Sequence, residues 1–155
     1  MYNKIVVPLD GSKLAECVLA HVETLAKGCR VKEVSFIRVV EPFTQPGNVE
    51  YPIKPEEIAR VNESQKAEAL AYLKKTTSAA QYAGVKVGQE MIFDSPVADS
   101  IIEHCKKNQA DLIIIATHGR SGVSRWVYGS VADRLLRAAC YPVLMVRAPG
   151  CVPGI

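Results

Sequence analysis

The chain has 155 residues, the size of one domain, with 48% hydrophobic residues, 23% charged residues and a formal net charge of +3. This composition excludes a disordered chain, and no apolar run approaches the roughly 18 residues that a membrane-spanning helix needs, so we expect no membrane segment. The basic residues are spread along the chain rather than gathered with aromatic residues, which argues against nucleic-acid binding.

Strand and helix patterns alternate from the start of the chain. An apolar run predicts a strand over Lys4–Leu9, and Ser12 can cap a following helix that Gly28 ends. Val34–Val40 is predicted as the second strand. The segment Glu41–Lys54 contains several prolines and predicts a loop that is long enough to carry a function.

The middle of the chain continues the alternation. A long helix is predicted from Pro55 to Tyr82, because proline suits the first helical turn. Val85–Phe93 is predicted as the third strand, and Gly88 within it suggests a bulge or an irregular edge. Ser95 and Pro96 indicate the start of the third helix, with the serine as cap and the proline in the first turn.

The last third of the chain completes an α/β pattern. Leu112–Ile115 is the uninterrupted apolar run expected of a strand covered on both faces, Ser130–Ala139 has helical spacing, and Pro142–Arg147 predicts a last short strand. The alternation predicts one open, twisted, five-stranded parallel sheet with helices on both faces. We assign residues 1–148 to this domain and residues 149–155, rich in proline and glycine, to a flexible tail.

A loop punctuated by glycines joins the fourth strand to the fourth helix. It reads Ala116-Thr117-His118-Gly119-Arg120-Ser121-Gly122, and the helix opens at Gly129-Ser130. Glycines let backbone N–H groups approach an anion, and the free N–H groups of a helix start favour negative charge, so phosphate binding is one interpretation. An ordinary strand-to-helix loop is the other, and Ser130 can either cap the helix or donate to a phosphate. The spacing excludes the phosphate loop of nucleoside triphosphatases and the dinucleotide fingerprint.

Four segments together resemble the universal stress protein family. They are Val7–Ser12, Ala116–Gly122, Gly129–Ala132 and Pro142–Arg147, and the resemblance runs over essentially the whole chain. The nucleotide-binding branch of that family carries a glycine, two residues, a glycine, nine residues, and then a glycine followed by serine or threonine. Here the pattern falls on Ala116, Gly119, Gly129 and Ser130, with alanine in place of the first glycine.

The resemblance implies the strand order 3-2-1-4-5, an ATP or AMP ligand with Mg²⁺ as an optional companion, and a homodimer formed through the last strand. That order brings Asp10 beside the glycine loop, where it can accept a hydrogen bond from an adenine amino group or help to position a metal; bracing the turn at Gly11-Ser12 is the alternative. The resemblance places Val39 at the position whose backbone atoms bind adenine in that family. Pro8 is expected to shape the end of the first strand. The candidate nucleotide site comprises Pro8, Asp10, Val39, Ala116, His118, Gly119, Arg120, Gly122, Gly129, Ser130 and Val131.

Two functions from different classes remain open. One is an adenylate-binding regulatory module of the stress response, and the other is a partner-binding domain of the same fold without useful nucleotide affinity, which Ala116 favours. An adenylyl-transferring enzyme would need a His-x-Gly-His motif, and Thr117-His118-Gly119-Arg120 lacks the second histidine. No nucleophile can be placed beside His118, so a structural hydrogen bond is its expected role and we expect a binding protein rather than a dedicated enzyme.

Cysteines and histidines outside the loop carry little functional signal. The five cysteines include no Cys-x-x-Cys pair, which argues against a disulfide framework or a structural zinc, and Cys17 and Cys105 are expected to be small buried hydrophobes. His21 and His104 are expected at the surface or its boundary. No secretion signal is evident at the start of the sequence, so we expect a cytoplasmic protein.

Overall fold

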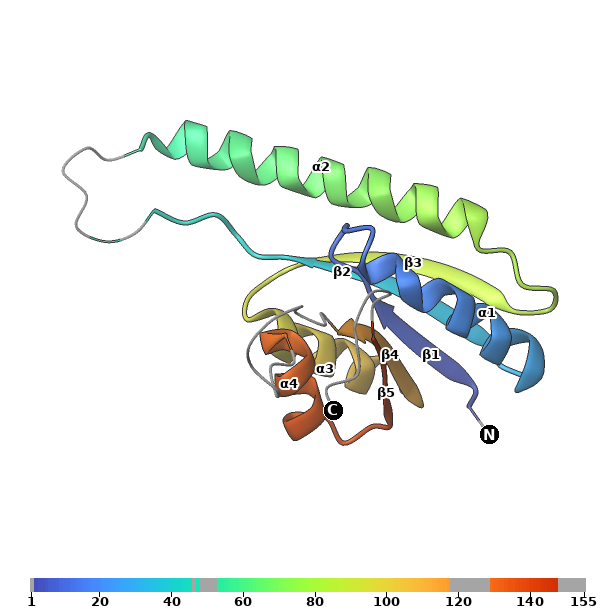
Figure 1. The fold of residues 1–155 in the computed structure, drawn as a ribbon. Helices are drawn as coiled ribbons and strands as arrows, with labels where there is room; N and C mark the ends of the chain where they lie inside the picture. The colour runs from blue at the N-terminus through green and yellow to red at the C-terminus, as the bar shows by residue number, and fades with distance from the viewer. Residues whose placement is uncertain (1, 46, 48–52, 118–128, 148–155) are drawn as a thin grey trace.

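The computed structural model describes residues 2–45, 47, 53–117 and 129–147. Its sheet contains β1 (Lys4–Pro8), β2 (Glu33–Val40), β3 (Lys86–Phe93), β4 (Leu112–Thr117) and β5 (Val143–Arg147). The strands lie in the order β3-β2-β1-β4-β5, and every neighbouring pair is parallel. Helices cover both faces (Figure 1). The predicted fold class and strand order are therefore confirmed.

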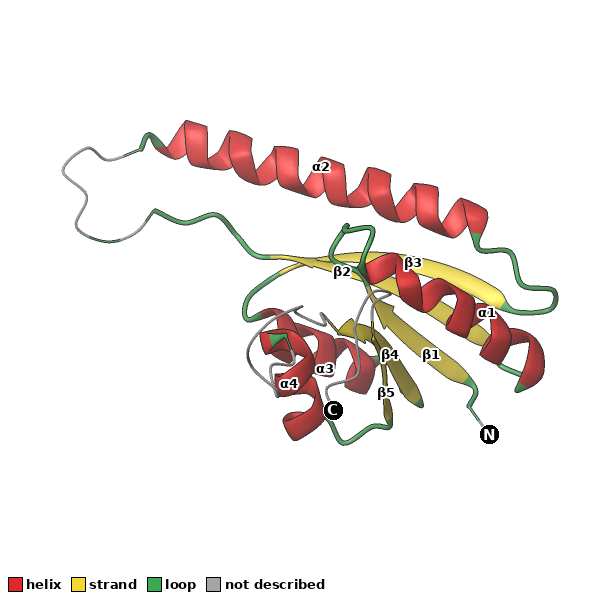
Figure 2. Ribbon diagram, viewed as in Figure 1, coloured by secondary structure: helices red, strands yellow, loops and turns green. Residues whose placement is uncertain are grey.

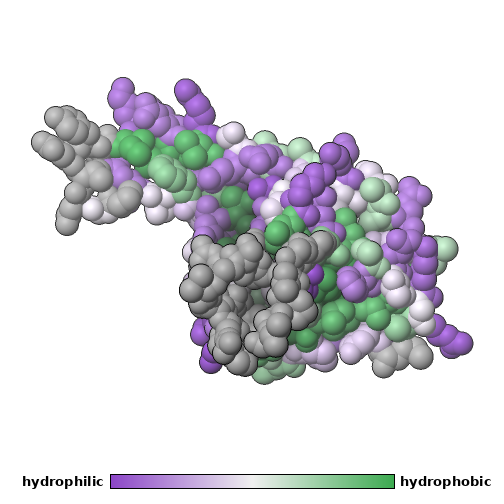
Figure 3. All heavy atoms as spheres, viewed as in Figure 1, coloured by the Kyte–Doolittle hydropathy of each residue, from purple (hydrophilic) through white to green (hydrophobic). Residues whose placement is uncertain are grey.

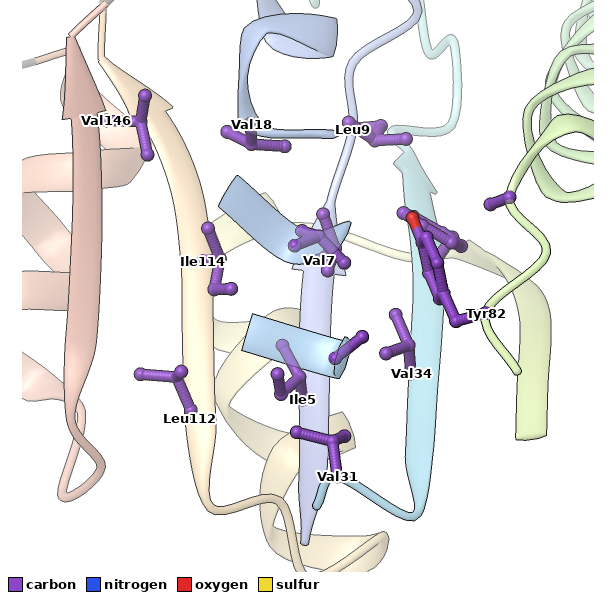
Figure 4. Close-up of a cluster of buried hydrophobic side chains, with 14 of the residues drawn as sticks. Ile5, Val7, Leu9, Val18, Val31, Val34, Tyr82, Leu112, Ile114 and Val146 are labelled. Carbon is purple, nitrogen blue, oxygen red and sulfur yellow. The ribbon is translucent and has the colours of Figure 1, made fainter. Parts of the chain in front are cut away.

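The two faces of the sheet carry separate hydrophobic cores. Helices α1 (Leu19–Gly28) and α2 (Pro55–Ala79) cover one face, and α3 (Val97–Lys107) and α4 (Ser130–Ala138) cover the other (Figure 2). Alternate residues of each strand point to opposite faces. The α1–α2 core includes Ile5, Val7, Val34, Phe36 and Ile114 (Figure 4). The α3–α4 core includes Val6, Ile37, Ile101, Ile113 and Leu135.

The central strands differ from the edge strands in burial. Ile5, Val6 and Val7 of β1 are fully buried, as a strand covered on both faces requires. The edge strand β3 pairs with β2 residue for residue from Lys86 to Phe93, so the predicted bulge at Gly88 is wrong. A Cβ on Gly88 would meet no atom within 4 Å, so no close packing at this position requires a glycine.

The first helix begins later than the sequence predicts. A 3₁₀ turn, η1, occupies Ala15–Val18, and α1 starts at Leu19. The Ser12 hydroxyl accepts a hydrogen bond from the Ala15 N–H at 3.1 Å, so Ser12 bonds to the first residue of this turn and does not cap α1, whose N-cap is Val18. Ala15 and Val18 are both buried, so this turn directs its apolar residues inward.

The start of α3 also differs from the prediction. The helix begins at Val97, and Pro96 stands at the capping position just before it rather than in the first turn. The Ser95 hydroxyl donates to Glu41 Oε1 at 3.0 Å, at the end of β2, and makes no cap. The Asp94 carboxylate accepts bonds from the Ser95 N–H at 2.8 Å and the Ser100 hydroxyl at 3.2 Å. Because the Ser95 hydroxyl bonds to the Glu41 carboxylate at the end of β2, it does not cap α3.

His104 of α3 is buried, so its predicted place at the surface or boundary is wrong. It follows Ile101 by three residues and therefore shares the inward face of the helix. Its Nδ1 lies 3.5 Å from Glu90 Oε1 on β3. His21 is exposed, Cys105 is fully buried and Cys17 is half-buried. Burial raises the pKa of the Cys105 thiol to about 11, which keeps it protonated.

Helix α2 is the longest element, with 25 residues, and only part of it lies on the sheet (Figure 1). Its later turns bury Ala69, Leu73 and Thr76. The earlier turns extend beyond the sheet beside the segment that follows β2, where Asn62 accepts a hydrogen bond from the Phe43 N–H at 2.8 Å. Figure 3 shows hydrophobic surface over this extension. No helix among the described residues is long and apolar enough to cross a membrane.

Candidate functional site

The order in which strands are added to the sheet changes direction between β1 and β4. From β1 the sheet extends to β2 and β3 on one side, while β4 and β5 lie on the other. The loops that leave β1 and β4 therefore diverge, and ligands of open parallel sheets bind outside the carboxyl ends of the strands at such a point. A cavity of about 190 Å³ opens there. The cavity thus lies where the strand order leads us to look for a ligand.

Separate parts of the chain contribute to the cavity wall. The candidates from the sequence that line it are Pro8, Asp10, Val39, Ala116, Gly129, Ser130 and Val131. The other described lining residues are Leu9, Ala15, Val97, Ile101, Ile115 and Ala132. The structure therefore brings together every candidate that it describes. His118, Gly119, Arg120 and Gly122 lie outside the described residues.

Asp10 lies in a constrained turn after β1. One carboxylate oxygen accepts a hydrogen bond from the Ser12 N–H at 2.8 Å, which is the bracing role considered as an alternative for this residue. Gly11 between them has φ +89°, a left-handed conformation that favours glycine. Asp10 is also one of the residues that line the cavity. Bracing the turn and facing a ligand are therefore compatible roles for Asp10.

Val39 presents backbone groups to the cavity region. The Leu9 N–H donates to the Ile37 carbonyl at 2.9 Å, beyond the last register pair of β1 and β2, Pro8 and Ile37. Backbone groups two residues apart in a strand point the same way, so the N–H and C=O of Val39 point toward the end of β1. Pro8 is buried at that strand end. Its position agrees with the predicted shaping role, and Val39 supplies hydrogen-bonding groups beside Asp10.

The opposite side of the cavity is the start of α4. Gly129 is the N-cap, Ser130 is the first helical residue, and no side chain of the described part of the chain caps this end of the helix. The capping role considered for Ser130 is therefore wrong, because the residue lies one position inside the helix. The first helical hydrogen bond runs from the Asp133 N–H to the Gly129 carbonyl at 2.9 Å. The N–H groups of residues 130–132 precede it, and such groups suit an anion.

Ala116 lies between these two sides. It is the next-to-last residue of β4, pairs with Val146 of β5 and is half-buried. Ala116 lines the cavity at the position where the related pattern has glycine, and it also packs against the α1–α2 core.

The chemistry of the cavity combines apolar walls with polar groups at two ends. A carboxylate and a strand backbone lie at one end, and a helix N-terminus lies at the other. This arrangement suits a ligand that has a flat apolar body, a hydrogen-bond donor and an anionic group. The described residues include no group of three or more histidine, cysteine or acidic side chains that could hold a metal ion.

Two kinds of residue near the cavity were not predicted from the sequence. Val97 and Ile101 line it from α3, and their one-turn spacing had indicated only a core-facing helix. Arg38 of β2 packs against Gly11 and so borders the turn that carries Asp10. An arginine within a strand gives no local signal of such a role, because the contact depends on how β1 and β2 end.

Comparison with known proteins places this geometry in a family. The model of the universal stress protein family matches residues 1–147. Universal stress protein MJ0531 of Methanocaldococcus jannaschii is 36% identical over 152 residues, which cover 96% of this chain and 84% of that protein. The solved structure of MJ0577, from the same organism, has a TM-score of 0.77 at 26% identity and covers 97% of this chain and 99% of its own.

Ligand-bearing structures share the same fold. An Arabidopsis thaliana universal stress protein with AMP bound has a TM-score of 0.62 at 19% identity, covering 96% of this chain and 93% of that chain. Two further solved universal stress proteins are complexes with cAMP and with dAMP. The nearly complete match to the family model and the identity with MJ0531 show that this chain belongs to the universal stress protein family.

Proposed function

We propose that the protein is a cytoplasmic, adenylate-binding regulatory module that takes ATP or AMP in the cavity at the carboxyl ends of β1 and β4. The observation that carries this proposal is the meeting of Asp10, Val39, Ala116 and Gly129–Val131 around one cavity. Relatives that hold AMP, cAMP or dAMP support the choice of an adenylate.

In this proposal the adenine ring binds at the end of the cavity formed by β1 and β2. The Asp10 carboxylate accepts a hydrogen bond from the exocyclic amino group, and backbone groups of Val39 bind the edge of the ring. Val97, Ile101 and Ile115 supply apolar contacts in the cavity wall. This division of work is typical of ligand sites, in which apolar walls provide most of the contact and a few polar groups fix the orientation.

The phosphates belong at the start of α4. The N–H groups of the first helical turn lie at that end, Ser130 lines it and offers a hydroxyl, and the helix dipole favours negative charge there. From the sequence, Gly119 and Gly122 allow close backbone approach, Arg120 supplies positive charge, and His118 makes a structural hydrogen bond. If ATP is the ligand, Mg²⁺ bound with it would neutralise part of the phosphate charge.

A second candidate function rests on Ala116. A domain of this fold that binds a partner without useful nucleotide affinity would tolerate a methyl group at the edge of the cavity, and Ala116 is half-buried there. The two functions differ in one measurable way. If Ala116 blocks the ligand, the wild-type protein binds no adenylate and Ala116→Gly restores binding.

We propose that the module is a homodimer paired through β5. The Ile113 N–H donates to the Pro142 carbonyl at 3.0 Å, so Pro142, Leu144 and Val146 direct backbone groups to β4, while Met145 directs its N–H to the open edge. Met145→Pro removes that outward N–H and is expected to give a monomer by light scattering. Leu144→Pro, which removes an inward N–H, is the control for damage to the sheet. A monomeric wild type, or a Met145→Pro variant that remains dimeric, contradicts this interface.

The binding experiment begins with protein purified without added nucleotide. Any bound small molecule is released by denaturation and identified by mass spectrometry, and the emptied protein is then titrated with ATP, ADP and AMP, with and without Mg²⁺. Saturable adenylate binding at one site per chain supports the proposal. If the wild-type protein binds no adenylate, the proposal fails, and binding by Ala116→Gly alone would favour the second candidate function.

A further inference from the structure

Arg38 lies behind the turn that carries Asp10. It follows Ile37 and precedes Val39 on β2, so its side chain extends to the α1–α2 face while Val39 faces the cavity. The guanidinium packs directly on Gly11. A Cβ built on Gly11 would lie 2.8 Å from Arg38 Nη1 and 2.9 Å from Cζ, so a side chain at position 11 would displace the guanidinium.

The aromatic ring of Tyr72, on α2, also packs against the Arg38 guanidinium. Cζ of Arg38 lies 5.4 Å from the centroid of the Tyr72 ring, within the range of a cation–π contact. Burial raises the pKa of Tyr72, and the negative charges of Glu16 and Asp10 add to the rise. The phenol therefore stays neutral, and the acidic groups that border the turn lie close enough to the Tyr72 hydroxyl to affect its titration.

The hydrogen bonds within the turn itself join residues that are two or three positions apart. Asp10 accepts from the Ser12 N–H, and the Ser12 hydroxyl accepts from the Ala15 N–H, at 2.8 and 3.1 Å. Both bonds border on solvent, where the net value of a hydrogen bond is small. A planar cation packed behind Gly11 adds a contact that limits how far the turn can move, and it ties the turn to α2 through Tyr72.

We propose that Arg38 is a positioning residue of the adenylate site, because it holds the Asp10–Gly11–Ser12 turn in the conformation that places Asp10 in the cavity wall. The inference rests on the proposed function for its ligand, but the turn can be tested without one. Arg38 acts through Asp10 and does not touch the nucleotide. Its flat guanidinium contacts both Gly11 and the Tyr72 ring, and the tetrahedral ammonium of lysine matches this packing less well.

The first test measures the turn without ligand. Amide hydrogen exchange is followed by NMR at Ser12 and Ala15 in the wild type, Arg38→Met and Arg38→Lys. We expect Arg38→Met to speed exchange at Ser12 about tenfold, because the stacked cation is lost, and Arg38→Lys to restore part of the protection. Arg60→Met, an exposed change on α2, is the matched control and should leave Ser12 unchanged. Unchanged exchange at Ser12 in Arg38→Met overturns the proposal.

The second test is a double-mutant cycle on AMP affinity, measured by calorimetry. We expect Arg38→Met to weaken AMP binding about tenfold in the wild-type background and to have almost no effect in the Asp10→Ala background. Equal losses in both backgrounds would mean that Arg38 acts independently of Asp10 and would overturn its positioning role. If the wild type binds no AMP, the proposed function fails, while the exchange measurement still decides whether Arg38 holds the turn.

Discussion

At the edge formed by the carboxyl ends of the strands, the molecule has a closed region of core and an open cavity. On the α1–α2 face, Leu9, Val18 and Val146 close the core and are 3%, 0% and 9% exposed (Figure 4). Between the ends of β1 and β4 the edge opens into the cavity, whose wall includes Ala116, Gly129 and Ala132. Branched side chains close the α1–α2 core, whereas small residues border the β4 and α4 side of the cavity beside branched ones such as Ile101.

This difference shows how the fold separates stability from binding. Well-packed interiors leave few voids, so a cavity at a fixed place requires positions at which large side chains are absent. The small residues at the β4 and α4 side of the cavity meet this requirement. Substitutions in the closed core should therefore change mainly the stability of the fold, and substitutions at the open edge should change mainly ligand affinity.

The largest expected effect is in the closed core. Phe36 is fully buried on the α1–α2 face, and Phe36→Ala should cost about 3–5 kcal/mol of unfolding free energy because it leaves a cavity. Val97→Ala at the open edge should cost about 1 kcal/mol, since Val97 is only half-buried and already borders a cavity. Urea unfolding measures both changes. Similar losses for the two variants would contradict the comparison.

The next effect is on ligand binding at the open edge. Gly129→Val places a branched side chain where the phosphate group is proposed to lie, and it should weaken AMP binding at least about tenfold while the unfolding free energy changes by less than about 1 kcal/mol. Leu136→Ala is a matched control on the same helix, because Leu136 is 50% exposed. A folded Gly129→Val variant with wild-type affinity would move the phosphates elsewhere.

A smaller effect concerns pH and the buried histidine of α3. Burial lowers the pKa of His104, although nearby Glu90 opposes this shift, and Lys4 and Lys107 reinforce it. The unfolded chain therefore binds the proton more readily than the folded protein, so stability is retained above the ordinary pKa of about 6.5 and decreases as the pH falls below it. Between about pH 7.5 and pH 5.5, the wild type should lose more unfolding free energy than His104→Gln. Equal losses would show that His104 does not titrate differently on folding.

The smallest effect concerns Ala116. If its methyl group only crowds the ligand, Ala116→Gly should tighten AMP binding roughly threefold, in keeping with the removal of one methyl group. Calorimetric titration of both proteins measures the change. Equal or weaker binding by Ala116→Gly would show that alanine fits this position as well as glycine does.

The sequence predicts the sheet well because the strand signals are local. Each strand begins and ends within two residues of its predicted bounds, since the apolar runs in β1, β2 and β4 reflect burial on both faces. The helix starts are less well predicted. The hydroxyl of Ser95 has two possible partners, a helix N–H and the carboxylate of Glu41, and only the three-dimensional arrangement of β2 and α3 decides between them.

The candidate site was predicted where motif and strand order coincide. Asp10, Val39, Ala116 and Gly129–Val131 line one cavity because parallel strands end at one edge of the sheet. Arg38 could not be found in this way, because its contact with Gly11 crosses from one strand to the turn after another. The burial of His104 has no clear sequence signal, because histidine is polar and the apolar spacing of α3 does not include it.

The most direct measurement of the central claim is a crystal structure of the protein grown with saturating AMP. We expect the adenine ring between Asp10 and Val39 and the phosphate at the N–H groups of Ser130 and Val131. AMP bound at another surface, or a cavity that stays empty at that concentration, would contradict the assignment of the open edge as the adenylate site.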